Sequence, residues 1–160
     1  MDTAFEKGDG YFPSTETEAK EWLLKVLKRF PKKVGDNVMD KWRLIGPLEL
    51  AEKLDQKMLK LEYNLELVDR ANFSFKRDYF GQLNKNGQFH GIGRAVWHDK
   101  NLYEGMFKDG FANGYGRQIY PNGSIYEGEW CDAVWHGHGC YIRPDGSISE
   151  GEFENGTFLG

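Results

Sequence analysis

Tyr126-Glu-Gly128-Glu-Trp130 is the stretch of sequence that decides the fold, because the C-terminal half of the chain repeats it. Tyr103-Glu-Gly105 precedes it and Ser149-Glu-Gly151 follows it, both at the same distance along the chain. Glycine pairs recur at the same interval, as Gly91 and Gly93, Gly114 and Gly116, and Gly137 and Gly139. A fixed period of this length is typical of stacked structural repeats. The sequence therefore predicts an array of similar units from Tyr79 onward.

Each unit has the pattern of a β-hairpin. Alternation along a strand places Tyr126 and Trp130 on one face and Glu127 and Glu129 on the other. Pro121-Asn-Gly-Ser and Pro144-Asp-Gly-Ser are turn signals between successive units. Lys100 replaces the turn glycine of the first unit, which predicts a different turn there.

The repeats are rich in both glycine and aromatic residues. They hold 16 of the 20 glycines and 15 of the 24 aromatic residues of the chain. Glycine weakens an ordinary strand, so its recurrence needs a compensating gain. We expect aromatic rings to lie flat against the backbone where side chains are missing. The glycines with this structural role are Gly81, Gly91, Gly93, Gly105, Gly114, Gly116, Gly128, Gly137, Gly139 and Gly151.

This arrangement resembles the MORN (membrane occupation and recognition nexus) repeat. The resemblance rests on Tyr-x-Gly-x-Trp/Phe, a glycine pair and a glycine turn that recur together at this fixed period, and it covers about half of the chain. It comprises three units and a truncated fourth, with departures at Leu83, Ala133 and Ser149. The resemblance implies an elongated, twisted antiparallel sheet that acts as a scaffold in cytoskeletal, ciliary or membrane-associated assemblies, or as an accessory module beside an enzyme.

The N-terminal half has helical patterns instead. The predicted fold class is α+β, with a helical docking segment over residues 1–70 and a MORN-repeat sheet over residues 71–160. One helix is expected after Thr15, and a short one with Val38, Trp42 and Ile45 on one side is closed at Gly46. A third, from Pro47, carries a seam of the coiled-coil type. The seam residues are Leu50, Leu54, Met58, Leu61, Leu65 and Val68. The seam either packs within the protein or docks onto a partner.

Composition narrows the functional class. The sequence contains no apolar run of about 20 residues and no N-terminal signal pattern, so a cytoplasmic location is expected. Two cysteines without a signal favour free thiols in a reducing compartment. Residues 79–160 carry 6 basic and 10 acidic side chains, a net charge of −4. This charge argues against nucleic acid and disfavours contact with an anionic membrane.

The sequence contains no catalytic or nucleotide-binding motif, so neither enzymatic activity nor a cofactor is predicted. Four potential zinc ligands lie close together in the sequence, but free thiols are the preferred interpretation and no metal is predicted. They are Cys131, His136, His138 and Cys140. Glutamates recur once per unit, as Glu104, Glu127 and Glu150. Two strand spacings put successive members about 10 Å apart, which predicts a solvated acidic face.

These features together predict a non-enzymatic scaffold or adaptor subunit in a multi-subunit assembly, in the cytoplasm and at the cytoskeleton or cilium. The alternatives are a phosphoinositide-binding membrane module and a regulatory subunit of a separate enzyme. Partner contacts are predicted along the helical seam and at five aromatic residues, Tyr103, Phe107, Tyr126, Trp130 and Phe153. The fourth unit stops at Gly160, so its outer strand is expected to be an uncovered edge that pairs with a second copy or another subunit.

Overall fold

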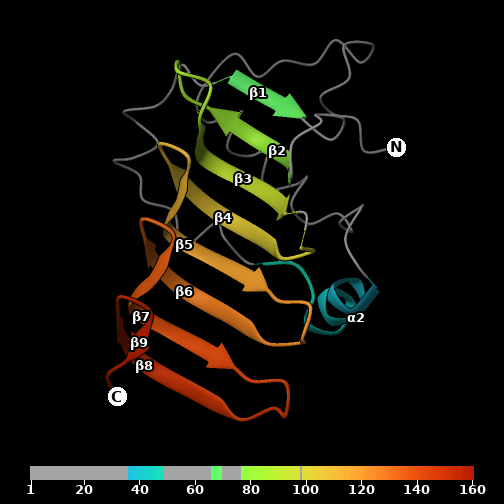
Figure 1. Cartoon of the computed structure of the whole chain (residues 1–160), viewed down its shortest axis with the longest axis vertical. Coiled ribbons are helices and arrows are strands. Elements are labelled where there is room, and N and C mark those ends of the chain that lie inside the picture. Colours follow the sequence, from blue (N-terminus) through green and yellow to red (C-terminus); the bar gives the residue numbers. More distant parts are fainter. Residues whose placement is uncertain (1–35, 49–65, 70–76, 98) are drawn as a thin grey trace.

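The computed structural model describes residues 36–48, 66–69, 77–97 and 99–160. They form one helix and a nine-stranded antiparallel sheet whose strands follow one another in chain order (Figure 1). The helix is α2 (Asp36–Ile45). The strands are β1 (Glu66–Asp69), β2 (Arg77–Leu83), β3 (Phe89–Trp97), β4 (Leu102–Lys108), β5 (Phe111–Ile119), β6 (Ile125–Cys131), β7 (Val134–Ile142), β8 (Ile148–Glu154) and β9 (Thr157–Phe158). Within the described ranges, no helix is long and apolar enough to span a bilayer.

The β2–β3, β4–β5 and β6–β7 hairpins each contain a register shift, and the tyrosine of each unit donates a hydrogen bond there. Between β4 and β5 the register shifts between Gly105 and Phe107, so Met106 has no opposite residue in β5. The Tyr103 hydroxyl donates a hydrogen bond to the Met106 carbonyl oxygen at 2.7 Å. The same bond joins Tyr79 to Gln82 at 2.6 Å and Tyr126 to Glu129 at 2.9 Å. A bulge leaves a carbonyl that the strand ladder cannot use, and the tyrosine provides its donor.

The glycines make room for these tyrosines. Gly105 and Gly116 lie opposite each other in β4 and β5, and the Tyr103 ring crosses both. A Cβ atom on Gly116 would overlap the Tyr103 hydroxyl, and one on Gly105 would press against the Gly116 backbone. The equivalent groups are Tyr79 with Gly81 and Gly93, and Tyr126 with Gly128 and Gly139. Each tyrosine therefore lies in a space that only glycine leaves open.

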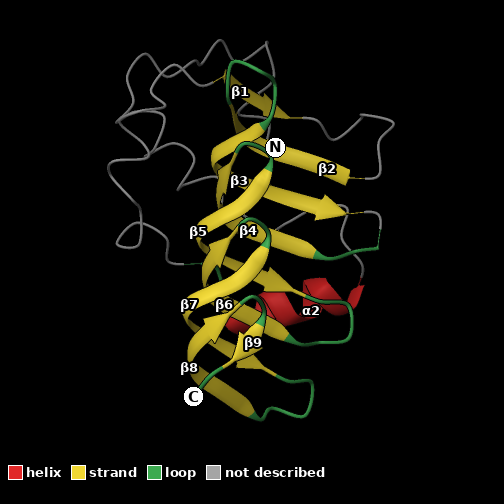
Figure 2. Ribbon diagram, turned by 60° about the vertical axis from the view of Figure 1, so that its left-hand side comes forward, coloured by secondary structure: helices red, strands yellow, loops and turns green. Residues whose placement is uncertain are grey.

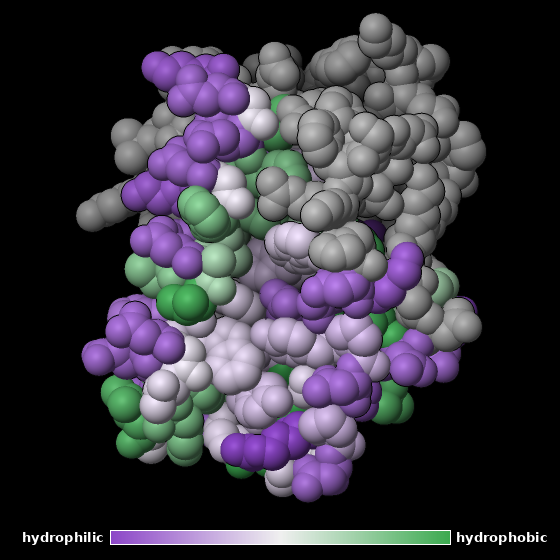
Figure 3. All heavy atoms as spheres, in the orientation of Figure 1, coloured by the Kyte–Doolittle hydropathy of each residue, from purple (hydrophilic) through white to green (hydrophobic). Residues whose placement is uncertain are grey.

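The aromatic rings join neighbouring units into one core. The Phe107 ring meets the Tyr79 ring edge-on at 5.4 Å and the Tyr103 ring at 4.9 Å. Trp130 lies in the same way between Tyr103 and Tyr126, at 5.2 Å from each. Edge-to-face geometry suits the ring quadrupoles. We call this side of the sheet the aromatic face. Side chains in the pale shades given to glycine, tryptophan and tyrosine gather in the middle of the view in Figure 3.

The hairpin tips are tight turns that reach back to the preceding unit. Both central residues have positive φ in Asp109-Gly110, Asp132-Ala133 and Asn155-Gly156, as in type I′ turns. The amide nitrogens of Gly110, Ala133 and Gly156 donate to the carbonyl oxygens of Phe89, Ala112 and Trp135, respectively, at 2.8–2.9 Å. These bonds join the tips along one side of the sheet, and Figure 2 shows the tips stacked one above another.

The short helix predicted around Trp42 is confirmed as α2. Gly46 ends it with φ +77°, and its amide donates to the Trp42 carbonyl oxygen at 2.8 Å. Of the three residues predicted on one side of the helix, Val38 and Trp42 are buried, whereas Ile45 is 36% exposed. The helix expected after Thr15 lies outside the described residues.

Three predictions are corrected by the strands. Residues 66–69 form β1 and pair with β2, so the helix from Pro47 does not extend to Val68 and the sheet begins before residue 71. The other seam residues (Leu50, Leu54, Met58, Leu61 and Leu65) lie outside the described residues. The turn at Lys100 is not different, because Lys100 adopts φ +72° and bonds to Trp97 as Gly123 bonds to Tyr120.

The third correction concerns the C-terminal edge. β9 pairs with Phe153 and Glu154 of β8, and the Leu159 amide donates to the Glu152 carbonyl oxygen at 2.8 Å. The Glu152 amide donates in turn to the Gly160 carbonyl oxygen at 3.4 Å. Residues of the fourth unit therefore cover the C-terminal part of β8, which was expected to be bare.

Candidate functional site

The face opposite the aromatic core holds α2, and we call it the helix face. An aliphatic row crosses it from strand to strand, with each member paired to the next in the register. The row consists of Val96, Leu102, Ile119, Ile125, Ile142 and Ile148. Val38 and Trp42 of α2 pack on its first four members. α2 is thus held to the sheet by apolar contact over β3–β6.

A second row on this face carries charge. Its members, paired in the same way, are Arg94, Glu104, Arg117, Glu127, Cys140 and Glu150. Glu104 is only 1% exposed and accepts from Arg94 Nε at 2.7 Å, Arg117 Nη2 at 3.2 Å and Trp42 Nε1 at 3.0 Å. A buried carboxylate is tolerated when it is paired and hydrogen-bonded in this way.

This network corrects the prediction of a solvated acidic face at Glu104, whereas Glu127 is half-buried and Glu150 is exposed as predicted. Glu104 lies under α2, and Arg117 Nη2 also donates to the Gly46 carbonyl oxygen just beyond the helix at 2.8 Å. The period of the glutamates was recognised, but Arg94 and Arg117 are separated by the same interval, and Cys140 is the next member. The alternation of charge is therefore encoded by the same period in the sequence.

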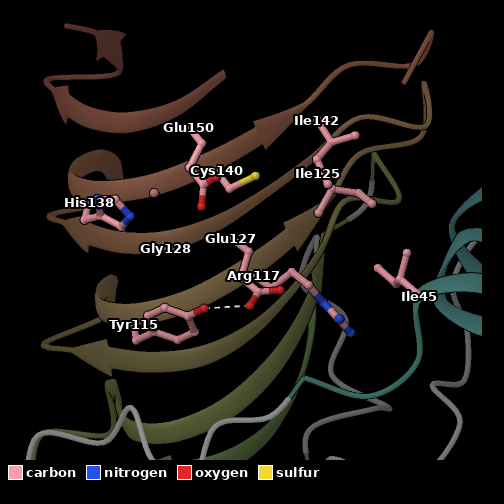
Figure 4. A pocket seen from close by; sticks show the side chains of 11 residues that line it. Ile45, Tyr115, Arg117, Ile125, Glu127, Gly128, His138, Cys140, Ile142 and Glu150 are labelled. Carbon is pink, nitrogen blue, oxygen red and sulfur yellow. Dashed lines mark hydrogen bonds between the residues drawn. The ribbon is translucent and has the colours of Figure 1, made fainter. Parts of the chain in front are cut away.

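A groove opens on the helix face beyond the end of α2. It has a volume of about 380 Å³, with Ile45 on one side and residues of β5–β8 along its floor (Figure 4). The aliphatic row continues into the groove as Ile142, which is half-buried, and beside the groove as Ile148, which is 58% exposed. Of the described residues, none covers Ile148 as Val38 and Trp42 cover the start of the row.

The groove is acidic. Tyr115 donates its hydroxyl hydrogen to Glu127 Oε2 at 2.6 Å (Figure 4). Burial, and then the hydrogen bond and charge of Glu127, raise the pKa of Tyr115. Glu150 is exposed and has no ion-pair or hydrogen-bond partner within the described ranges. Glu127 and Glu150 therefore face the groove without a nearby cation between them.

Cys140 lies between these two carboxylates in the charged row. Burial raises the pKa of its thiol, and the charges of Glu150 and Glu127 raise it further. Both cysteines are free thiols. Among the described residues, no three metal-ligand side chains form a cluster that could hold a metal ion, and this includes His136 and His138 beside the two cysteines. The electrostatic environment of Cys140 in the groove is therefore negative.

The five aromatic residues predicted to contact a partner all lie in the core. Tyr103, Phe107, Tyr126, Trp130 and Phe153 are each less than a tenth exposed. They support the sheet from inside and offer little surface to a partner. Partly buried rings around them are Trp97, Tyr120, Trp135 and Tyr141. The predicted structural glycines lie in β2–β8, and Gly91, Gly114 and Gly137 have positive φ there.

The fold and this site define a class: a single sheet built from repeated hairpins of similar length, with tyrosines packed over glycines and a helix on the other face. The family model for the MORN repeat matches residues 79–102, 103–125 and 126–148. Residues 79–148 are therefore three consecutive MORN repeats. No curated protein matches the chain.

Proposed function

We propose that this chain is a non-enzymatic adaptor subunit, whose elongated, twisted MORN sheet holds a protein partner on its helix face. The proposal rests on one observation, which is that α2 covers only part of the helix face. α2 covers the aliphatic row over β3–β6, while the same row continues through the half-buried Ile142 to Ile148, which is 58% exposed. A face that already binds a helix, and extends beyond it with the same chemistry, suits a second protein segment.

The charged side chains on this face support binding better than catalysis. Glu104 is buried, and three donors engage its two oxygens. It thus lacks the access that a general acid or base needs. The pKa of Cys140 is raised, which is the opposite of what nucleophilic catalysis by a thiol requires. Glu104 and Cys140 thus act in folding and recognition.

A second contact surface is proposed at the C-terminal edge, where a second copy or another subunit adds to β8. β9 covers only the end of β8, and the Glu152 amide points to Gly160 on that outer side. Amides of an antiparallel strand alternate in direction, so those of Ile148 and Glu150 point to the same side. These amides provide donors for an added strand.

We place this adaptor in a cytoplasmic complex of the cytoskeleton or cilium, the setting that the MORN repeats suggest. The test is affinity capture with the full-length chain, followed by mass spectrometry. If the chain is an adaptor that uses the helix face, it should capture a defined set of proteins. The Ile148→Asp variant should no longer capture them. Equal capture by both forms would contradict the proposal. Capture of a single enzyme whose activity changes on binding would instead show a regulatory subunit.

A membrane module that binds phosphoinositides is the alternative. The net charge of −4 over residues 79–160 argues against it, because an anionic leaflet repels an acidic surface. Flotation with vesicles containing phosphatidylinositol bisphosphate separates the two functions. We expect no binding at physiological salt. Binding that disappears as salt is raised would favour the membrane module.

A further inference from the structure

The alternation of charge on the helix face stops at one position. From β3 to β6 the row reads Arg94, Glu104, Arg117 and Glu127, so every carboxylate has a cation beside it. In β7 the next member is Cys140, and in β8 it is Glu150. With strands spaced by about 4.8 Å, Glu127 and Glu150 stand about 10 Å apart with a neutral thiol between them. A positive charge is missing at Cys140.

The aliphatic row shows a similar change at the same strands. Val96 to Ile125 lie under α2 and are all less than a tenth exposed. Ile142 and Ile148 continue the row next to the groove, and Ile148 is 58% exposed. The groove therefore presents the two features that hold α2, an apolar strip and a line of charge, without a helix of the described chain above them.

One buried donor on the groove wall has no partner within the described ranges. Arg117 is 3% exposed and lies on the groove wall. Its Nη2 atom is engaged by Glu104 and Gly46, but its Nε atom has no acceptor within the described ranges. Most buried donors in folded proteins have a partner. The Nε atom is enclosed by the protein, so an oxygen of a bound segment reaches it only if the Arg117 side chain moves.

The spacing of the sheet suits a helix as the occupant. Packed helices lie about 8–10 Å apart, and this equals two strand spacings. α2 makes its main sheet contact with β5, so a helix packed beside it falls over β7, which carries Cys140 and Ile142. An added strand would pair at a sheet edge, whereas the groove is on a face and offers side chains only.

We propose that the groove binds an amphipathic α-helix of a partner protein, whose apolar side covers Ile142 and Ile148 and whose arginine or lysine lies between Glu127 and Glu150. This inference rests on the proposed adaptor function and names the chemistry of its partner. The cation completes the alternation at Cys140. Opposite charges in a partly desolvated site attract more strongly than on an open surface.

The test is a titration of the full-length chain with a synthetic amphipathic helix of leucine, alanine and arginine. Binding is monitored by the NMR chemical shifts of the chain. A matched peptide has glutamate at every arginine position. We expect shift changes centred on Cys140, Ile142 and Ile148 with the cationic peptide at millimolar concentration, and none with the acidic one. Equal shifts with both peptides, shifts centred on the aromatic face, or no shifts would overturn the proposal.

Substitutions in the groove test where the positive charge of the peptide binds. Glu150→Lys should weaken binding of the cationic peptide at least tenfold, and Cys140→Arg should do the same by supplying the missing cation within the chain. Glu154→Lys makes the same charge change on β8 outside the groove, and Cys140→Ser keeps the size of the side chain. Both should bind within twofold of the natural chain. Equal weakening by Glu150→Lys and Glu154→Lys would show only general charge attraction and refute the site.

Two outcomes separate this inference from the adaptor function. If Ile148→Asp abolishes capture of a partner and Glu150→Lys does not, the adaptor function is supported. The proposal of a cationic helix in the groove is then refuted. The chain also carries its own basic stretch, with Lys25 and Lys28. If changing both to glutamate in the free chain shifts the signals of Cys140 and Ile148, the groove is filled from within the protein and the partner helix is refuted.

Discussion

Trp42 donates its indole hydrogen to Oε1 of Glu104 at 3.0 Å, and the two residues stand 62 positions apart in the chain. This bond joins α2 to the buried charge of the sheet. Glu104 also holds Arg94 and Arg117, so one carboxylate connects the helix with β3, β4 and β5. The position of α2 beside the groove is therefore fixed by a polar contact as well as by apolar packing.

Trp42→Phe keeps an aromatic ring on α2 and removes the donor together with part of the buried indole ring. We expect a loss of about 1.5–3 kcal/mol of unfolding free energy, as for a hydrogen bond to a charged group. Urea unfolding measures it, with Glu104→Gln and the double variant to complete a cycle. Additive losses in the cycle would show that the two side chains do not interact.

Trp130→Ala removes the ring that lies between Tyr103 and Tyr126. Truncation of a buried aromatic residue should cost about 3–5 kcal/mol. Trp130→Phe is the control, because Phe107 and Phe153 occupy this place in other units, and it keeps a ring while it removes part of the indole and the bond from Nε1 to the Gly116 carbonyl oxygen. Its cost should be about 1 kcal/mol. A loss for the alanine variant no larger than that of the control would contradict the role of this ring in the core.

Ala133→Gly should stabilise the protein by about 0.5–1 kcal/mol, because Ala133 has φ +72° in a turn that has glycine in other units. Gly110→Ala is the converse. A Cβ atom on Gly110 would meet nothing within 4 Å, so only its φ of +94° opposes the change. Thermal or urea unfolding should show opposite signs for the two variants. The same sign in both would exclude backbone strain as the cause.

Cys140 should ionise at higher pH than a free thiol. Burial and the negative charges of Glu150 and Glu127 disfavour the thiolate and so raise its pKa. Alkylation by iodoacetamide in a Cys131→Ser background should follow the thiolate, with a midpoint above that of N-acetylcysteine. Glu150→Gln removes one negative charge and should move the midpoint down, while Glu154→Gln should leave it unchanged. A midpoint at or below that of N-acetylcysteine would contradict the acidic environment.

The outer edge of β8 should show two rates of hydrogen exchange. The amides of Ile148 and Glu150 point outward beyond the part of β8 that β9 covers, so they should exchange fast in the isolated chain. The Glu152 amide bonds to Gly160 and should exchange more slowly. In an assembly through this edge, the first two amides should slow markedly. Slow exchange of Ile148 and Glu150 in the monomer would show that the edge is already covered.

The repeats could be predicted from the sequence because period and glycine placement are local signals. Tyr126, Gly128 and Trp130 specify their hairpin within a short stretch of chain, and the short helix before Gly46 has its own cap. The groove could not be predicted in the same way. It depends on α2 lying over Glu104, a contact between distant residues, and on Ile148 being left uncovered. β1 was assigned to a helix because Leu65 and Val68 extend a helical spacing that pairing with β2 overrides.

Gly128 and Gly139 line the groove, and the Tyr126 ring lies over the same two residues on the aromatic face. Only the thickness of one peptide chain separates the groove from that ring. The Trp130 and Trp135 rings lie 5.2 and 4.6 Å from the Tyr126 ring. The sheet thus places three chromophores directly behind its open groove. Intrinsic fluorescence can therefore report on the groove, in whose described lining Tyr115 is the one aromatic residue.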